Sequence, residues 1–237
     1  MNKNSFCSWS GGKDSTLSLY KALNNGLEVK YLLNMMNEDG KNSRSHNLSL
    51  EILKEQSNSL DIPLITRNTT WDNYEKIFID TLKQFKDEGI NNGIFGDIDL
   101  EDHRKWEEKV CTKADLEAVL PLWQQKRKVL LNEFLDLGFK TMIVVINEHY
   151  MDKKYLGKIL DKDLVNEFEE IGIDPNGENG EYHSVVLDGP IFNYSIKVKK
   201  QDKLYNKGYW FQEIKLINRI TRKGNNGKLY ITWIKTI

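Results

Sequence analysis

The clearest indication of the fold is the segment Phe6-Cys7-Ser8-Trp9-Ser10-Gly11-Gly12-Lys13-Asp14-Ser15. It passes from a short apolar strand into an amphipathic helix that we expect to end near Gly26. Glycines let the backbone come close to an anion, and the first N–H groups and the dipole of the helix favour negative charge. Lys13 adds a cation. The stretch therefore predicts a phosphate-binding loop between the first strand and the first helix.

Strand-like and helix-like segments alternate after this loop. Helices joining consecutive strands are typical of a parallel sheet that is covered on both faces. We therefore expect an α/β fold with a five-stranded parallel sheet over residues 1–150. After the first strand and helix, the expected strands are 28–36, 61–65, 93–98 and 141–146, and the expected helices are 45–60, 71–88, 100–110 and 123–137.

The pattern changes after about residue 150. Two short helical stretches lead into a glycine-rich loop at 174–180, and apolar residues then recur with the period of two that is typical of strands. The expected strands are 185–187, 192–198, 210–220 and 229–233, with turns at 206–208 and 224–227. Residues 151–237 are therefore expected to form a smaller, mostly antiparallel region.

Composition limits the class of protein. The chain has 237 residues, a net charge of -1 and two cysteines. It has no apolar run long enough to span a membrane and no signal-peptide pattern, so we expect a cytoplasmic protein with reduced thiols. Residues 190–237 contain eleven Lys or Arg and two acids. Nucleic acid, an acidic partner or the acidic remainder of the chain could face this segment; the alternation of basic with apolar residues favours the last.

The kind of phosphate loop can be narrowed further. A Walker loop needs an upstream glycine and Ser or Thr directly after the lysine, whereas Lys13 is followed by Asp14. Ser10–Ser15 instead resembles the pyrophosphate loop of the adenine-nucleotide alpha-hydrolase superfamily. The resemblance implies a Rossmann-like, HUP-type sheet and an enzyme that splits ATP between the alpha and beta phosphates. A helix-capping turn is the alternative interpretation.

A distant stretch points to one branch of that superfamily. Gly177–Ser184 and Leu187–Phe192 resemble the signature of the diphthine-ammonia ligase family. So do Gly96–Ile98 with Arg104, Glu107, Val110 and Cys111, and then Pro121–Trp123. Ser184 stands where the family usually has threonine, and the hydroxyl is kept. The resemblance implies ATP and Mg²⁺ as ligands. The implied nucleotide-binding residues are Ser10, Gly11, Gly12, Lys13, Asp14, Ser15, His46 and Asp97.

Several of these residues allow two interpretations. Asp14 and Asp97 are candidate Mg²⁺ ligands, but Asp14 also suits the first turn of a helix, and Asp97 could bind substrate or cap the following helix. The candidate catalytic residues are Lys13, Glu178, Glu181 and His183. The last three could orient an amine, accept protons from ammonia or hold a cationic substrate. Alternatively, they belong to a polar loop at a sheet edge.

The resemblance implies an ATP-dependent amide ligase. It would adenylate a carboxylate, release pyrophosphate and transfer ammonia to give a carboxamide and AMP, with residues 1–150 binding ATP and 151–237 facing the acceptor. The acceptor would be diphthine-like, on a translation factor or a small molecule. Nucleic acid and membrane are not expected as partners, and homodimer formation stays open. The alternatives are a tRNA-modifying enzyme of the same superfamily and a non-catalytic adenine-nucleotide sensor.

Overall fold

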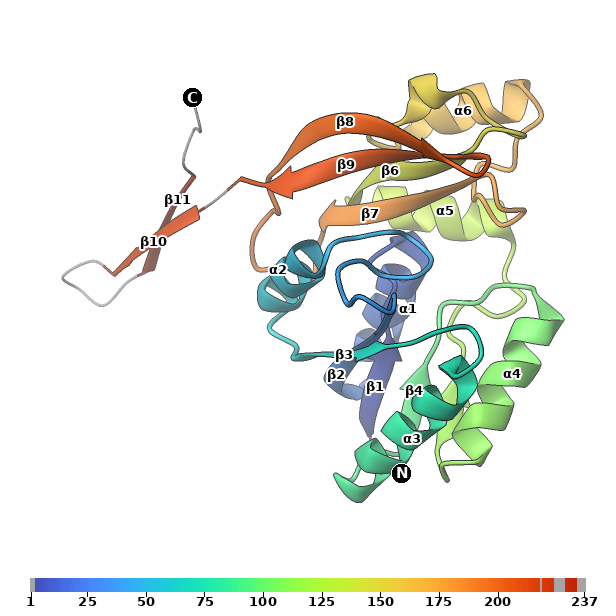
Figure 1. The fold of residues 1–237 in the computed structure, drawn as a ribbon, viewed down its shortest axis with the longest axis vertical. Coiled ribbons are helices and arrows are strands. Elements are labelled where there is room, and N and C mark those ends of the chain that lie inside the picture. The colour runs from blue at the N-terminus through green and yellow to red at the C-terminus, as the bar shows by residue number, and fades with distance from the viewer. Residues whose placement is uncertain (1–2, 218, 224–228, 234–237) are drawn as a thin grey trace.

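The computed structural model describes residues 3–217, 219–223 and 229–233. Its central layer is a five-stranded sheet with the order β3-β2-β1-β4-β5 (Figure 1). All four strand pairs are parallel. The strands are β1 (Asn4–Ser8), β2 (Glu28–Met36), β3 (Leu64–Asn68), β4 (Asn92–Ile94) and β5 (Glu117–Val119). The predicted five-stranded parallel sheet is confirmed, and the phosphate loop follows its central strand.

Helices cover both faces of this sheet, as predicted. Adjacent residues of a strand point to opposite faces, so Phe6 and Cys7 of β1 belong to two different apolar clusters. The cluster around Cys7 contains residues of α1 and α2, and the cluster around Phe6 contains residues of α3 and α4. These helices are α1 (Lys13–Asn24), α2 (Leu50–Leu60), α3 (Tyr74–Asp87) and α4 (Glu101–Thr112).

A second, antiparallel sheet has the order β7-β6-β9-β8. Figure 1 shows it lying across one end of the parallel layer, with β7 next to α1 and α2. Its strands are β6 (Lys140–Asn147), β7 (Tyr182–Asp188), β8 (Val198–Asn206) and β9 (Tyr209–Leu216). α5 (Arg127–Asp136), a 3-10 turn (Lys153–Tyr155) and α6 (Lys162–Glu170) complete this region. The predicted antiparallel appendage is confirmed.

One strand was assigned to the wrong sheet. Residues 141–146, expected as the fifth parallel strand, form β6 and pair antiparallel with β7 and β9. The fifth parallel strand is the three-residue β5, which the sequence pattern did not predict. β6 is buried along six consecutive residues, because apolar clusters cover both of its faces, and this gives it the appearance of a central parallel strand.

The expected strand at 192–198 is also wrong. Phe192 and Ile196 are buried in the core, but their segment is a loop that bonds to Ser59 and Leu187 through single backbone contacts. The turn at 206–208 is confirmed between β8 and β9. The expected strand at 210–220 is divided, and its end belongs to β10 (Arg219–Lys223), which pairs antiparallel with β11 (Leu229–Trp233).

The expected turn at 224–227 and part of the basic segment lie outside the described residues. The domain boundary near residue 150 stays a prediction. Among the helices of the described chain, none has the length and apolar character needed to cross a membrane.

Candidate active site

The phosphate loop is shaped by two glycines. Gly11 has a φ of +81°, in the left-handed region that disfavours other residues. Gly12 is the N-cap residue of α1 in an extended conformation. A Cβ atom on Gly12 would lie 2.3 Å from Cε1 of His46, so the loop needs glycine there for lack of space. Glycine is therefore required at position 11 by the backbone conformation and at position 12 by the lack of space.

Hydroxyl groups fix the course of the loop. The Oγ atoms of Ser10 and Ser15 are 3.0 Å apart, and the Gly12 N–H donates to Ser10 Oγ over 3.3 Å. The hydroxyls of Ser15 and Thr16 both donate to the Gly12 carbonyl. The loop is thus held in place by its own side chains, with the start of α1 at its end.

A buried glutamine joins the loop to the antiparallel sheet. Gln56 of α2 is fully buried, and its Nε2 donates to the carbonyls of Gly11 (2.9 Å) and Val186 (2.8 Å). Its Oε1 accepts from the Trp9 indole N–H over 3.0 Å. The Val186 N–H also donates directly to the Gly11 carbonyl over 2.9 Å. The position of β7 is therefore coupled to the shape of the phosphate loop.

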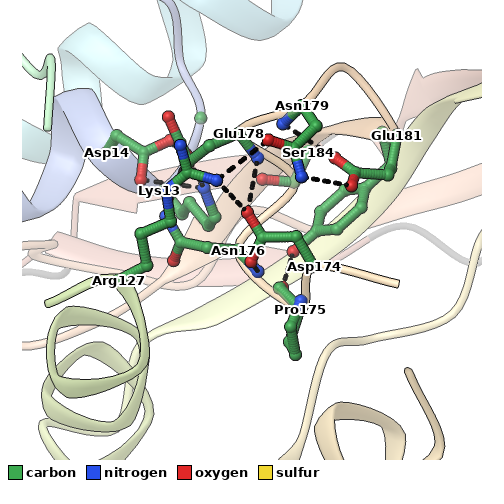
Figure 2. Close-up of polar contacts among 12 residues, drawn as sticks. Lys13, Asp14, Arg127, Asp174, Pro175, Asn176, Glu178, Asn179, Glu181 and Ser184 are labelled. Atoms are coloured by element: carbon green, nitrogen blue, oxygen red, sulfur yellow. Dashed lines mark hydrogen bonds and ion pairs between the residues drawn. The ribbon is translucent and has the colours of Figure 1, made fainter. Parts of the chain in front are cut away.

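Lys13 is the electrostatic link between the two regions (Figure 2). Its Nζ lies 2.7 Å from Oδ2 of Asp14 and 3.2 Å from Oε1 of Glu178, and the residue is only 6% exposed. Burial alone would lower the pKa of Lys13, but attraction to the two carboxylates outweighs it and the pKa is raised. Lys13 is therefore a permanent cation at neutral pH.

Glu178 has an unusual protonation equilibrium. Burial raises its pKa, Lys13 opposes this, the Asp14 charge adds to it, and the resulting pKa is about 7. Asn176 Nδ2 donates to the same Oε1 that contacts Lys13, over 2.8 Å. Glu178 can therefore accept or donate a proton near neutral pH.

The loop that carries Glu178 is clamped by Arg127 at the start of α5. Arg127 Nη1 donates to Asp174 Oδ2 (2.6 Å) and to Asn179 Oδ1 (3.1 Å). Its Nε and Nη2 bind Asp99, which follows β4. Asp174 Oδ2 in turn accepts the backbone N–H of Glu178 over 3.3 Å. Arg127 thus ties the Glu178 loop to the parallel-sheet region.

Glu181 holds the same loop from within. It is 3% exposed, and its two carboxylate oxygens accept from the backbone N–H and the side-chain amide of Asn179, over 2.9 and 3.0 Å. Figure 2 shows Glu181 on the side of the loop away from Lys13. Glu181 is not one of the residues that line the larger cavity of the site, which is described below.

Two histidine rings, those of His46 and His183, lie against each other beside the phosphate loop. The ring centroids of His46 and His183 are 4.7 Å apart, and His46 Nδ1 is 2.8 Å from the carbonyl of Ser184. Because that carbonyl can only accept, Nδ1 carries the proton and Nε2 is the free acceptor. Burial lowers the pKa of His46 to about 4 and that of His183 to about 3. Both rings are therefore neutral at pH 7.

Asp97 lies in the loop after β4 and bonds to α4. Its Oδ1 is 2.6 Å from His103 Nδ1, and its carboxylate also hydrogen bonds to Glu107. Burial would raise the pKa of Asp97, but these two bonds lower it overall. Burial and the same bond raise the pKa of Glu107 to about 11, so the shared proton resides on Glu107. Oε2 of Glu107 is buried and has no hydrogen-bond partner among the described residues.

These groups surround one cavity of about 750 Å³ between the two regions. A smaller cavity of about 100 Å³ adjoins it and shares Ser10 and His46. Asn34 lines the smaller cavity; its Nδ2 donates to the Trp9 carbonyl, and its buried Oδ1 lacks a partner within the described chain. The residues that line the larger cavity include Ser10, Lys13, Asp14, Ser15, His46, Tyr74, Asp97, Trp106, Glu107, Glu178 and His183.

Comparison with known proteins identifies the family. Residues 3–118 match the Diphthamide synthase N-terminal domain, and residues 126–220 match the Diphthamide synthase C-terminal domain. The chain belongs to the diphthamide synthase family. The two matches together cover most of the chain. They include every residue named above as lining a cavity.

Curated relatives of this family member are named diphthine--ammonia ligase. The chain is 28% identical over 214 residues to the protein of that name from Schizosaccharomyces pombe, with 79% of the chain covered but only 34% of the relative. It is 26% identical over 219 residues to the one from Homo sapiens, covering 81% of the chain and 82% of the relative.

A solved structure also resembles the chain. It is the crystal structure of a predicted subunit of tRNA methyltransferase from Methanocaldococcus jannaschii, with 15% identity and a TM-score of 0.44. The match covers 78% of this chain and 97% of that one.

The fold of this diphthamide synthase family chain brings most of the predicted site residues together. Ser10, Lys13, Asp14, Ser15, His46, Asp97, Glu178 and His183 all line the larger cavity. Gly11 and Gly12 are not among the residues that line it, but they shape the loop. Glu181 is separate from this group, with its carboxylate turned toward Asn179.

Sequence reasoning missed several residues around the same site. No sequence pattern indicated Arg127, Asn176 or Asn34. Their contacts are with residues that are distant in the sequence or lie in an irregular loop. Gln56 could have been found: it falls on the helical face that carries Ile52 and Leu60, where a polar residue must have buried partners.

Few groups in the site could hold Mg²⁺. Within the described residues, no three His, Cys, Asp or Glu side chains form a group that could hold a metal ion. Mg²⁺ is usually bound through one or two carboxylates together with substrate phosphates. Asp14 meets this requirement, since it lines the cavity beside Lys13 and is 30% exposed. Neither carboxylate is free, since both oxygens of Asp14 bond to Lys13 Nζ (2.8 and 2.7 Å) and Asp97 bonds to His103 and Glu107. Asp14 is the better candidate because it stands in the phosphate loop itself.

Proposed function

We propose that the chain is an ATP-dependent carboxylate-ammonia ligase that forms AMP. It would adenylate a carboxylate with release of pyrophosphate and then transfer ammonia to give a carboxamide. The single observation that supports this proposal is the Lys13–Glu178 contact, because the phosphate loop and the Gly177–Ser184 loop, which we expect to face the acceptor, line one cavity. The names of the curated relatives favour a diphthine-like acceptor.

The phosphate end of the site would stabilise the negative charge of the ATP phosphates. Lys13 and the first N–H groups of α1 would bind the beta and gamma phosphates and stabilise the charge that develops as pyrophosphate leaves. Ser10 and Ser15 would exchange their mutual hydrogen bond for bonds to phosphate oxygens. Mg²⁺, when bound, would neutralise phosphate oxygens, with Asp14 as its protein ligand. Asp97 stays a weaker candidate for the same role.

The adenine end would lie in the smaller cavity. Asn34 Oδ1 is a buried acceptor without a partner within the described chain, and the exocyclic amine of adenine is a donor that would satisfy it. This cavity adjoins the phosphate loop at Ser10. A nucleotide would therefore run from the smaller cavity into the larger one.

The acceptor side would handle the proton of the attacking amine. Adenylation is required because hydroxide is a poor leaving group, whereas AMP is a good one. Glu178, with a pKa of about 7, is suited to accept the proton that the amine loses. The neutral imidazoles of His183 and His46 would offer hydrogen bonds without repelling a cationic group. Glu181 would act indirectly, by holding the loop that carries Glu178.

A pyrophosphate-release assay tests this function. ATP and ammonium chloride are supplied with a panel of carboxylates that includes elongation factor 2 carrying diphthine. We expect acceptor-dependent release of pyrophosphate and formation of AMP, both abolished in Lys13→Met. Lys21→Met is the matched control, since Lys21 lies on the same helix and pairs with Glu133 away from the cavity. Nucleotide binding without release under any acceptor would indicate a sensor and contradict the proposal.

A further inference from the structure

One wall of the larger cavity carries none of the phosphate-loop or Glu178-loop residues used above, although it includes Asp97, the weaker Mg²⁺ candidate. It is formed by α3 and α4, which contribute Tyr74 and Trp106, and by Asp97 in the loop after β4. The rings of Tyr74 and Trp106 pack together with centroids 5.8 Å apart, and the Trp106 indole N–H donates to Glu75. The wall is thus a rigid aromatic surface that ends at a pair of carboxyl groups.

Glu107 is the unusual member of this wall. It is 4% exposed and lines the cavity, yet its Oε2 has no hydrogen-bond partner in the described part of the chain. A buried acceptor left without a donor destabilises the folded chain. Glu107 lines the cavity while this oxygen is shielded from water, so the destabilisation is removed if the side chain turns toward the cavity and a ligand brings a donor to this atom.

Asp97 offers further acceptor capacity at the same place. A carboxylate has about four lone-pair positions, and the hydrogen bonds that the structure shows for Asp97 come from His103 and Glu107. No lysine or arginine among the described residues forms an ion pair with either carboxyl group. Acceptors, a negative charge and aromatic faces together favour a small ligand with several N–H groups.

We propose that Asp97 and Glu107 form the subsite that binds the nitrogen donor, ammonia or ammonium, beside the Tyr74 and Trp106 rings. The proposal rests on the ligase function proposed above. The subsite hydrogen bonds to one N–H through Glu107 Oε2 and to another through Asp97. It shares a cavity with Glu178 and Lys13, so the bound nitrogen has access to the acceptor without crossing the protein surface.

The transfer step balances with the groups already named. The nitrogen lone pair forms the N–C bond to the acyl carbon, and the C–O bond to AMP breaks with its electron pair going to the phosphate oxygen. The amine loses one proton, which Glu178 accepts and passes to water. Ammonium that enters must first lose a proton to solvent, because only the neutral amine has a free lone pair.

Two substitutions at one position separate the role of the acceptor atom from that of packing. In Glu107→Gln the amide nitrogen can donate to Asp97 and the amide oxygen keeps an acceptor in place of Oε2. In Glu107→Met both hydrogen bonds are lost at similar volume. The proposal expects the KM for ammonium to stay within about twofold in the first variant and to rise about tenfold or more in the second, as loss of a buried hydrogen bond would cause.

The experiment measures acceptor-dependent pyrophosphate release and carboxamide formation against ammonium and against ATP. Asp97→Asn serves as a second variant if Glu107→Met does not fold, and the same rise in the KM for ammonium is expected. Glu108→Gln is the matched control, because Glu108 is on the outside of α4 and pairs with Arg104. The KM for ATP should be unchanged in the Glu107 and Glu108 variants.

The outcomes distinguish the two proposals. An unchanged KM for ammonium in Glu107→Met and Asp97→Asn, with a wild-type enzyme that releases pyrophosphate, would overturn the subsite alone. A rise in the KM for ATP instead would assign Oε2 to the nucleotide and also overturn it. No acceptor-dependent release by the wild-type protein would overturn both the ligase function and the subsite.

Discussion

Nζ of Lys13 lies 3.2 Å from Oε1 of Glu178, although the two residues are 165 positions apart in the sequence. Lys13 belongs to α1, the helix that follows the phosphate loop, and Glu178 belongs to the loop before β7. Their contact joins a permanent cation to a carboxyl group whose pKa is about 7. Any nucleotide phosphate that binds Lys13 would compete with Glu178, and the protonation of Glu178 would then respond to nucleotide binding.

Glu178→Gln tests the proton-accepting role. A base with a pKa of about 7 is active only when deprotonated, so the wild-type rate of carboxamide formation should rise with pH and level off above about 7. The variant should lose this rise and about 100-fold in kcat. The measurement is a pH profile of kcat at saturating ATP, with the concentration of neutral ammonia held equal at every pH. A variant with the wild-type profile would exclude Glu178 as the base.

Arg127→Met tests the clamp on the Glu178 loop. The change removes the bonds to Asp99, Asp174 and Asn179, so the loop should lose its fixed position. We expect kcat to fall about 10- to 100-fold, as small displacements of catalytic groups do, with little change in the KM for ATP. Lys128 is the next residue in the sequence and forms an exposed ion pair with Glu169, so Lys128→Met should behave as wild type. Equal effects of the two substitutions would argue against the clamp.

Gly12→Ala tests the fit between the phosphate loop and His46. The added methyl would lie 2.3 Å from Cε1 of His46, so the loop or the ring must move and ATP binding should weaken at least tenfold. The backbone of Gly12 is extended, so the effect comes from contact and not from backbone strain. Combining it with His46→Ala should recover part of the binding, which a double-mutant cycle with isothermal titration can measure. Strict additivity would show that the contact is unimportant.

The sequence was most informative where the physical requirement is local. The course of β1, the glycines of the loop and the start of α1 at Lys13 follow from neighbouring residues, and the structure confirms them. The placement of β6 could not be read in the same way. Its apolar run fits a strand covered on both faces, and either sheet provides such cover, so only long-range pairing decides.

Short or irregular segments account for the remaining differences. β5 has three residues, too few for any periodicity to indicate a strand. Phe192 and Ile196 are spaced like strand residues but reach the core from a loop. At the site, the direction of the Glu181 side chain depends on Asn179 and the bend of the loop, which no local pattern encodes.

The bonds of Gln56 and Val186 to the Gly11 carbonyl have a consequence for how the chain can be divided. The loop that would hold the nucleotide takes part of its shape from β7, a strand of the second sheet. A fragment limited to residues 3–118 would retain every residue of the phosphate loop and yet lose this support. Nucleotide binding is therefore a property of the assembled pair of regions, and exchanging one half with that of a distant relative would require the Gln56 contact to be preserved.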